Sequence, residues 1–196
     1  LLAAVLLGAT AAALFVLPRW WWVVGALALA ASQTAIASSW SDAKFGSLAN
    51  LILLVGVLYG VSSQGPWSFR AEYERAVSQQ LARTGETPIV TDADLAHLPD
   101  AVQRYLRIAG AVGQPQVKNF RARFHGEIRS GPDARWMPFT AEQHNFYDDP
   151  SRLFSMQASF LAIPIEALHL YVGPSATMRV KVASLIQVAD AKGPEM

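Results

Sequence analysis

The N-terminal third of the chain limits the possible folds most strongly, because three apolar stretches follow one another there almost without charge. From residue 1 to residue 68 the only charged side chains are Arg19, Asp42 and Lys44. About a quarter of the residues of a soluble domain are charged, so this segment is unsuited to a water-exposed surface. We predict a transmembrane region at residues 1–63, with helices at about residues 1–17, 20–37 and 47–63.

The lengths and flanks of these stretches fit a lipid bilayer. As a helix, Leu1–Leu17 would measure about 26 Å, close to the thickness of the hydrocarbon layer. Tryptophans at positions 20–22 open the second stretch, and tryptophan favours the level of the lipid headgroups. The third stretch is the shortest, so it would need Tyr59 and Trp67 as interfacial anchors.

Two other interpretations of the apolar region are open. Residues 23–37 resemble the apolar core of a signal peptide that ends in a small-residue cleavage site. The stretches could also be buried helices of a large soluble protein. We favour transmembrane helices, because apolar segments lie on both sides of residues 23–37 and the rest of the chain is too short to enclose three such helices.

The apolar region is typical of an anchor rather than a transport path. No ionisable side chain falls in the middle of a predicted span, where transporters usually carry one. Gly56 and Gly60 share one face of the third helix, which favours close packing within the anchor or in a homo-oligomer. Basic residues favour cytoplasmic loops, so Arg19 in the first loop and Lys44 in the second support opposite orientations almost equally. With a short cytoplasmic N-terminal tail, three crossings place the rest of the chain outside, and we expect a multi-pass protein of the cell membrane with that orientation.

The composition of the remaining chain excludes several functions. It carries 14 basic and 14 acidic residues, so it has no excess of positive charge and nucleic acid is not an expected partner. The absence of cysteine excludes disulfides, thiolate zinc sites and cysteine nucleophiles. The chain starts within an apolar run, without an initiator methionine, and we expect it to be a fragment of a longer protein.

Two regions with different periodicity follow the predicted anchor. Residues 64–115 predict a helical connector, with a helix that starts after Ser68 and another at Pro99–Ala109. Between them, Thr91 and Asp94 form a helix-start signal before a short turn. From residue 116 to residue 196 the period is two, which is typical of half-buried antiparallel strands. Five strands are expected, near residues 117–129, 136–147, 153–160, 165–172 and 177–188. The predicted fold class is α+β, with an antiparallel β-meander that forms an incomplete sheet or half-barrel after the transmembrane helices.

One face of the predicted sheet is rich in large apolar side chains. They are Phe120, Phe124, Ile128, Phe154, Met156, Phe160, Met178 and Val180. Ordinary core packing is one explanation. The other is a curved sheet that binds a lipid or other apolar ligand, for which we single out Phe120, Phe124, Phe154, Met156, Phe160 and Met178.

The sequence shows no specific catalytic or metal-binding motif. The histidines His97, His125, His144 and His169 lack metal-ligand spacing, and no nucleophile elbow, phosphate-binding loop or dinucleotide fingerprint occurs. We therefore expect no metal and no cofactor. If the protein is an enzyme, its polar site would be built from Arg104, Arg135, Gln143 and His144.

A set of short motifs resembles an uncharacterised bacterial membrane-associated family of unknown function. The motifs are R-Y-L at residues 104–106, G-x-x-R at residues 126–129 and R-W-M-P-F-T-A-E-Q at residues 135–143. The resemblance covers about residues 98–196. It implies a domain longer than the present chain and no particular activity.

Three hypotheses for the function follow from these observations. The leading one is a non-enzymatic, membrane-anchored module that binds an apolar ligand or a partner in the cell envelope. The second is an enzyme with the polar site named above. The third is a structural or self-associating membrane protein built on Gly56 and Gly60.

Overall fold

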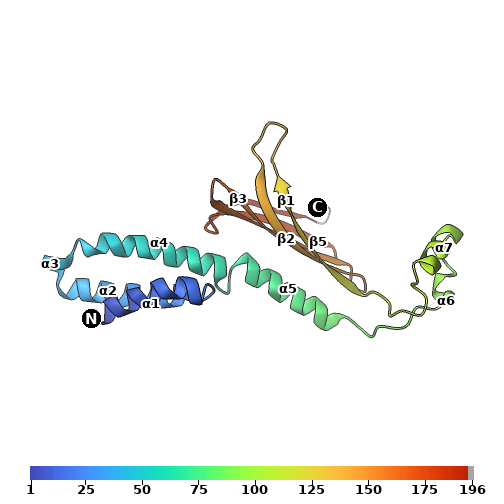
Figure 1. Cartoon of the computed structure of the whole chain (residues 1–196), viewed down its shortest axis with the longest axis horizontal. Coiled ribbons are helices and arrows are strands. Elements are labelled where there is room, and N and C mark those ends of the chain that lie inside the picture. Colours follow the sequence, from blue (N-terminus) through green and yellow to red (C-terminus); the bar gives the residue numbers. More distant parts are fainter. Residues whose placement is uncertain (194–196) are drawn as a thin grey trace.

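The helices and the sheet of this protein follow one another along an elongated molecule. The computed structural model describes residues 1–193. Figure 1 shows the N-terminal helices at one end, the sheet in the middle and two short helices at the other end. The helices are α1 (Leu2–Val16), α2 (Trp21–Ser38), α3 (Trp40–Ala43), α4 (Gly46–Gln64), α5 (Phe69–Arg83), α6 (Asp92–Leu95) and α7 (Asp100–Ile108). The strands are β1 (Asn119–Ile128), β2 (Met137–Phe146), β3 (Ser151–Phe160), β4 (Ile163–Val172), β5 (Ser175–Val182) and β6 (Ile186–Gly193).

Two helical segments of the described chain are long and apolar enough to cross a membrane. They are α2 and the segment that begins with α4. The third apolar helix, α1, has 15 residues and measures about 22 Å, which is short for a span. It ends early because Leu17 precedes Pro18, and a residue before proline disfavours the helical conformation.

Small and polar residues bring the N-terminal helices together, with α2 between α1 and α4. A Cβ atom added at Gly60 would lie 2.5 Å from the Cβ of Trp22, so α4 approaches α2 closely at this point. A Cβ added at Gly56 would meet only the ring of Trp21, at 3.8 Å. The side-chain amide of Asn50 donates a hydrogen bond of 2.8 Å to Gln33. This bond connects α4 to α2.

Helix α5 joins the N-terminal helices to the sheet. It begins after Ser68, whose hydroxyl accepts a hydrogen bond of 3.1 Å from the backbone N–H of Ala71, as an N-cap residue does. Phe69 and Tyr73 of α5 pack with buried residues of β2, β3 and β4. Among these, Leu153 and Leu168 are fully buried. Burial of one leucine side chain contributes roughly 2 kcal/mol, so this core holds the sheet on the helix.

The six strands form one antiparallel sheet in the order β1 to β6. The sequence predicts five strands, which is wrong, since the stretch 177–188 contributes to both β5 and β6. The turn between them places Ala183 and Ser184 at positive φ. Glycine and asparagine usually occupy such positions, so no ordinary turn residue marks this turn in the sequence.

The two faces of the sheet have different surroundings. Helix α5 packs on the face that carries Leu153 and Leu168, which we call the covered face. The register of the strands places the predicted apolar residues on the opposite face, which we call the open face. They are Phe120, Phe124, Ile128, Phe154, Met156, Phe160, Met178 and Val180. Helix α5 therefore does not pack on the face that carries more aromatic side chains.

A small helical unit made of α6 and α7 lies between α5 and β1. Thr91 and Asp94 form the capping box that the sequence predicts at the start of α6. An isolated antiparallel bridge pairs Ile89 with Pro115 and closes the unit at its base. Figure 1 shows this unit beyond the end of the sheet.

We expect Gly60→Ala to destabilise the packing of α4 on α2, because the new methyl group would overlap Trp22. Overpacking of this kind costs about 1–3 kcal/mol. Gly56→Ala is the matched control and should change stability by less than about 0.5 kcal/mol. Unfolding of the full chain in mixed micelles measures both. Equal effects of the two substitutions would contradict the close contact at Gly60.

Candidate functional site

The open face leaves large apolar side chains exposed. Phe120, Phe124 and Met178 are 40%, 43% and 41% exposed, while the alanines between them, such as Ala141 and Ala167, are buried. In the register, Phe124, Ala141, Met156, Ala167 and Val180 form one apolar row across five strands, whereas Phe120 lies beside Asn145 and Met178 lies beside His169. Exposed apolar surfaces of this kind usually mark a binding site.

The open face changes in polarity along its length. The end of the sheet at the β3–β4 turn lies next to α4, since Tyr59 and Ser63 line a cavity of about 410 Å³ together with Ser159 and Pro164. The open-face residues nearest this end are all apolar, namely Ile128, Met137, Phe139, Ala158, Phe160, Ile163 and Ile165. Polar residues join at the other end, namely Gln143, Asn145, Arg152 and His169.

Two buried polar atoms at the distal end of the open face have no hydrogen-bond partner within residues 1–193. They are Nδ2 of Asn145 and Nε2 of His169. Burial lowers the pKa of His169, and the nearby charge of Arg152 lowers it further. The imidazole is therefore neutral at pH 7. Unpaired buried polar groups are rare in folded proteins, so these two atoms distinguish this end of the face from the apolar end.

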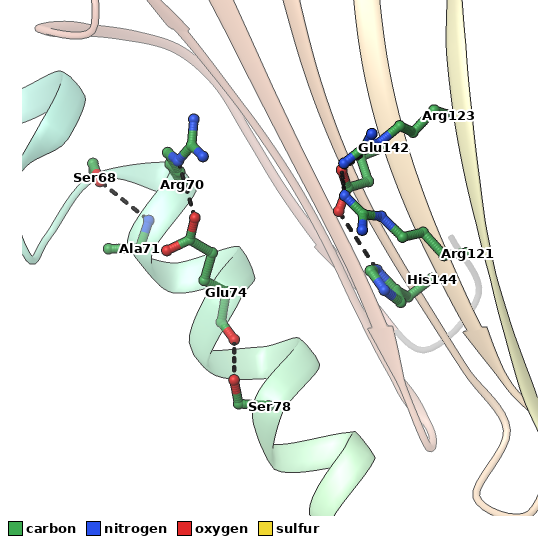
Figure 2. A network of polar contacts seen from close by, with 9 residues as sticks. All are labelled: Ser68, Arg70, Ala71, Glu74, Ser78, Arg121, Arg123, Glu142 and His144. Atoms are coloured by element: carbon green, nitrogen blue, oxygen red, sulfur yellow. Dashed lines mark hydrogen bonds and ion pairs between the residues drawn. The ribbon is translucent and has the colours of Figure 1, made fainter. Parts of the chain in front are cut away.

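A polar cavity of about 490 Å³ lies on the covered face, between α5 and β1–β3. Arg70 and Glu74 line it from α5, and Arg121, Arg123 and Glu142 line it from the sheet. Figure 2 shows both β1 arginines at the single Glu142 carboxylate, with N–O distances of 2.6 and 3.3 Å. Burial acts to raise the pKa of Glu142, but the two arginine hydrogen bonds outweigh it and hold that pKa below its usual value.

A buried tyrosine–histidine pair connects α5 to β2 beside this network. The hydroxyl of Tyr73 lies 2.8 Å from Nδ1 of His144. Burial lowers the pKa of His144, although the Glu142 carboxylate acts in the opposite direction. Burial, followed by the charge of Glu142, raises the pKa of Tyr73. Both groups are therefore neutral at pH 7, and they share one hydrogen bond, whose donor is set by the tautomer of the imidazole.

The structure does not bring together the four residues named for an enzyme site. Arg104 is exposed on α7, which Figure 1 shows beyond the sheet, and Arg135 is exposed in the β1–β2 loop. Gln143 and His144 are neighbours on β2, so their side chains project to opposite faces. Within residues 1–193, no group of three His, Asp or Glu side chains is placed to hold a metal ion.

The polar residues that do converge were not singled out in the sequence, apart from His144. Arg121 pairs with His144, and Arg123 pairs with Glu142, in the register of β1 with β2. The signal in the sequence was the spacing of two within each strand, which places each pair of polar residues on one face. Only the register could show that the two pairs lie opposite each other.

These observations define an α+β protein with two helical segments that could cross a membrane and a six-stranded antiparallel sheet. Residues 88–196 match the model of a family described as "Family of unknown function (DUF6544)". The chain belongs to the DUF6544 family, and the resemblance to an uncharacterised family is thereby confirmed. No curated protein and no solved structure matches the chain.

Tyr73→Phe should destabilise the contact of α5 with the sheet by about 1–2 kcal/mol, because the buried Nδ1 of His144 would lose its hydrogen-bond partner. Tyr105→Phe is the matched control, since Tyr105 is 68% exposed on α7. Denaturant unfolding of the full chain in detergent, followed by tryptophan fluorescence, measures both variants. A loss no larger than that of the control would show that the hydrogen bond adds nothing to stability.

The depressed pKa of His144 makes the fold less stable in acid. The unfolded chain takes up a proton at His144 near the ordinary value of 6.5, whereas the folded chain does so only at lower pH. Stability is therefore present above about pH 6.5 and is lost as the pH falls below it. His144→Gln should reduce this loss between about pH 7.5 and 5.5, and His125→Gln, at an exposed position of β1, should not. Identical pH profiles for wild type and His144→Gln would contradict the assignment.

Proposed function

We propose that this protein is a membrane-anchored binding module that holds an amphipathic, largely apolar ligand on the open face of its sheet. The proposal rests on the observation that no helix of residues 1–193 packs broadly on that face. The only helix that packs broadly on the sheet within residues 1–193 lies on the covered face. Phe120, Phe124 and Met178 consequently stay exposed. Lining of this kind, with a few polar groups at one end, suits a lipid.

For the anchor, we infer three membrane crossings by α1, α2 and α4. Helix α1 is apolar and packs along α2, and flanking residues or local thinning of the bilayer can accommodate a short span. Lys44 lies in the loop between α2 and α4. A cytoplasmic position of that loop would place the sheet on the extracytoplasmic side, as the sequence predicts.

For the domains, we infer that the sheet and α5 act as one unit. The sequence assigns α5 to a connector at residues 64–115, but Phe69 and Tyr73 belong to the same core as the strands. The binding unit would therefore begin at Ser68 and continue in residues 116–193, with α6 and α7 as an appended part.

The ligand would lie along the strands, with its apolar part toward α4 and its polar part toward the other end. The apolar rows nearest α4 support the first placement. The polar end of the open face, with Asn145, Arg152 and His169, supports the second. Methionine side chains such as Met156 and Met178 would adapt to chains of different shape.

Phe124→Asp should weaken binding of a fluorescent fatty acid by the full chain at least about tenfold, because a carboxylate would be placed in the apolar row. Ile108→Asp is the matched control, since Ile108 is an apolar residue on α7 with 87% exposure. Native mass spectrometry of the purified protein should show copurified lipid that Phe124→Asp loses. Absence of both bound lipid and probe binding in the wild type would refute the proposed ligand.

A further inference from the structure

The β1–β2 loop and two shorter turns lie at the end of the sheet that faces α4. The β3–β4 turn contains Leu161 and Ala162, and the β5–β6 turn contains Ala183 and Ser184. Antiparallel strands return to the same end every second turn, so these two turns must be neighbours. The cavity shared by Tyr59 of α4 and Ser159 of β3 fixes which end this is. Figure 1 shows this end of the sheet beside the C-terminal end of α4.

Both turns expose apolar side chains and carry no charge. Leu161 and Ile163 are 63% and 46% exposed at the first turn, and Leu185 and Ile186 are 45% and 63% exposed at the second. No charged residue occurs at positions 159–165 or 182–189. A turn in contact with water would normally be polar.

The backbone of these turns strengthens the argument. Leu161 and Ala162 both have positive φ, at 51° and 65°, and Ala183 and Ser184 have φ of 51° and 56°. Side chains other than glycine, asparagine and aspartate rarely adopt this conformation, because the Cβ atom approaches the backbone oxygen. The favoured pair in a two-residue hairpin turn is Asn-Gly. Both turns thus lack the glycine or asparagine that this backbone favours, and three of the four positions, Leu161, Ala162 and Ala183, carry apolar side chains.

The turns at the opposite end of the sheet are of the ordinary kind. The β4–β5 turn places Gly173 at positive φ. The β2–β3 turn contains Asp148, Asp149 and Pro150, all of them exposed. At the α4 end, the β1–β2 loop is also polar, with Arg129, Asp133 and Arg135, so the apolar turns are confined to β3–β4 and β5–β6. The contrast between these two turns and the others indicates two different environments.

Exposed tryptophans gather at the same level of the molecule. A cavity of about 460 Å³ is lined by Trp20 and Trp22 at the start of α2 and by Gln64 and Gly65 at the end of α4. Trp20 is 62% exposed and Trp67 is 78% exposed. Tryptophan concentrates at the headgroup level of membrane proteins. The two apolar turns lie beside the same end of α4.

We propose that the β3–β4 and β5–β6 turns insert into the outer part of the bilayer that the N-terminal helices span, as a second membrane contact. The proposal rests on the proposed anchor and adds that the sheet touches the lipid directly. The inserted part consists of Leu161, Ile163, Leu185 and Ile186. Because Phe160 and Ile163 also belong to the open face, its apolar rows then begin at the bilayer surface, where an acyl chain can pass onto the sheet.

The absence of native cysteine allows a direct test in the full chain. Single cysteines at Leu161→Cys and Leu185→Cys carry an environment-sensitive fluorophore, and the protein is reconstituted in phosphatidylcholine nanodiscs that contain a lipid-attached quencher. We expect at least about twofold stronger quenching at both positions than at Ser175→Cys, since inserted groups lie within the headgroup and acyl boundary. Ser175 is exposed at the β4–β5 turn and is the matched control.

A fourth label separates the inference from the anchor. Leu51→Cys lies on α4, where the side chain is 57% exposed, and its label should be quenched strongly if α4 spans the bilayer. Strong quenching at Leu51 with no difference between Leu161, Leu185 and Ser175 would overturn the inserted turns and leave the anchor intact. Weak quenching at Leu51 would overturn both.

A second variant tests the cost that the apolar turn imposes on folding. The double substitution L161N/A162G gives the β3–β4 turn its favoured residues and should raise the thermal unfolding midpoint in detergent by a few degrees. The same variant, labelled at Leu185→Cys, should show weaker lipid quenching than the single-cysteine protein. If the unfolding midpoint does not rise and the quenching does not change, the idea that Leu161 and Ala162 contact lipid at a cost in stability is contradicted.

Discussion

The packing of α5 on the sheet determines how the rest of the molecule is arranged. This helix follows α4 after only residues 65–68, so any surface that binds α5 is held at a fixed place relative to the N-terminal helices. Phe69 and Tyr73 bury Leu153 and Leu168 completely. Ion pairs join the helix to the sheet near both of its ends, from Glu72 to Arg179 and from Arg83 to Asp149. These pairs and the Tyr73–His144 bond give the apolar contact its register.

Covering one face of a sheet leaves the other face available. An antiparallel sheet ordinarily buries its apolar face and turns its polar face to water. Here α5 occupies the covered face, where a compact apolar patch lies beside the Arg121–Glu142–His144 network. The more aromatic open face keeps its exposed phenylalanines. A sheet in this arrangement gains its stability from one face and leaves the other uncovered, which is why we place the proposed ligand on the open face.

In the proposed function, the placement of the sheet next to α4 would link the open face to the membrane. The apolar rows of the open face lie at the end nearest the anchor, and its polar residues lie farther away. The apolar β3–β4 and β5–β6 turns occur at the same end. A ligand drawn from the bilayer would therefore meet apolar side chains first and polar ones last, in the order of an acyl chain and its headgroup.

The sequence by itself determined the order and type of most elements, since each depends on local chemistry. The apolar stretches, the Ser68 cap, the Thr91–Asp94 capping box and the alternation of β1 all act within a few residues, and the structure has helices or strands there. The division of residues 177–188 into two strands escaped prediction, because Ala183 and Ser184 adopt a turn conformation that their side chains do not announce. The alternation also grouped the residues of the open face correctly. Only the tertiary structure decided which face α5 would cover, that Gln143 and His144 would point apart, and that Tyr73 would meet His144 from 71 residues away. The reason is physical: periodicity shows which side chains share a face, whereas the choice of a partner for that face depends on long-range complementarity of shape and charge.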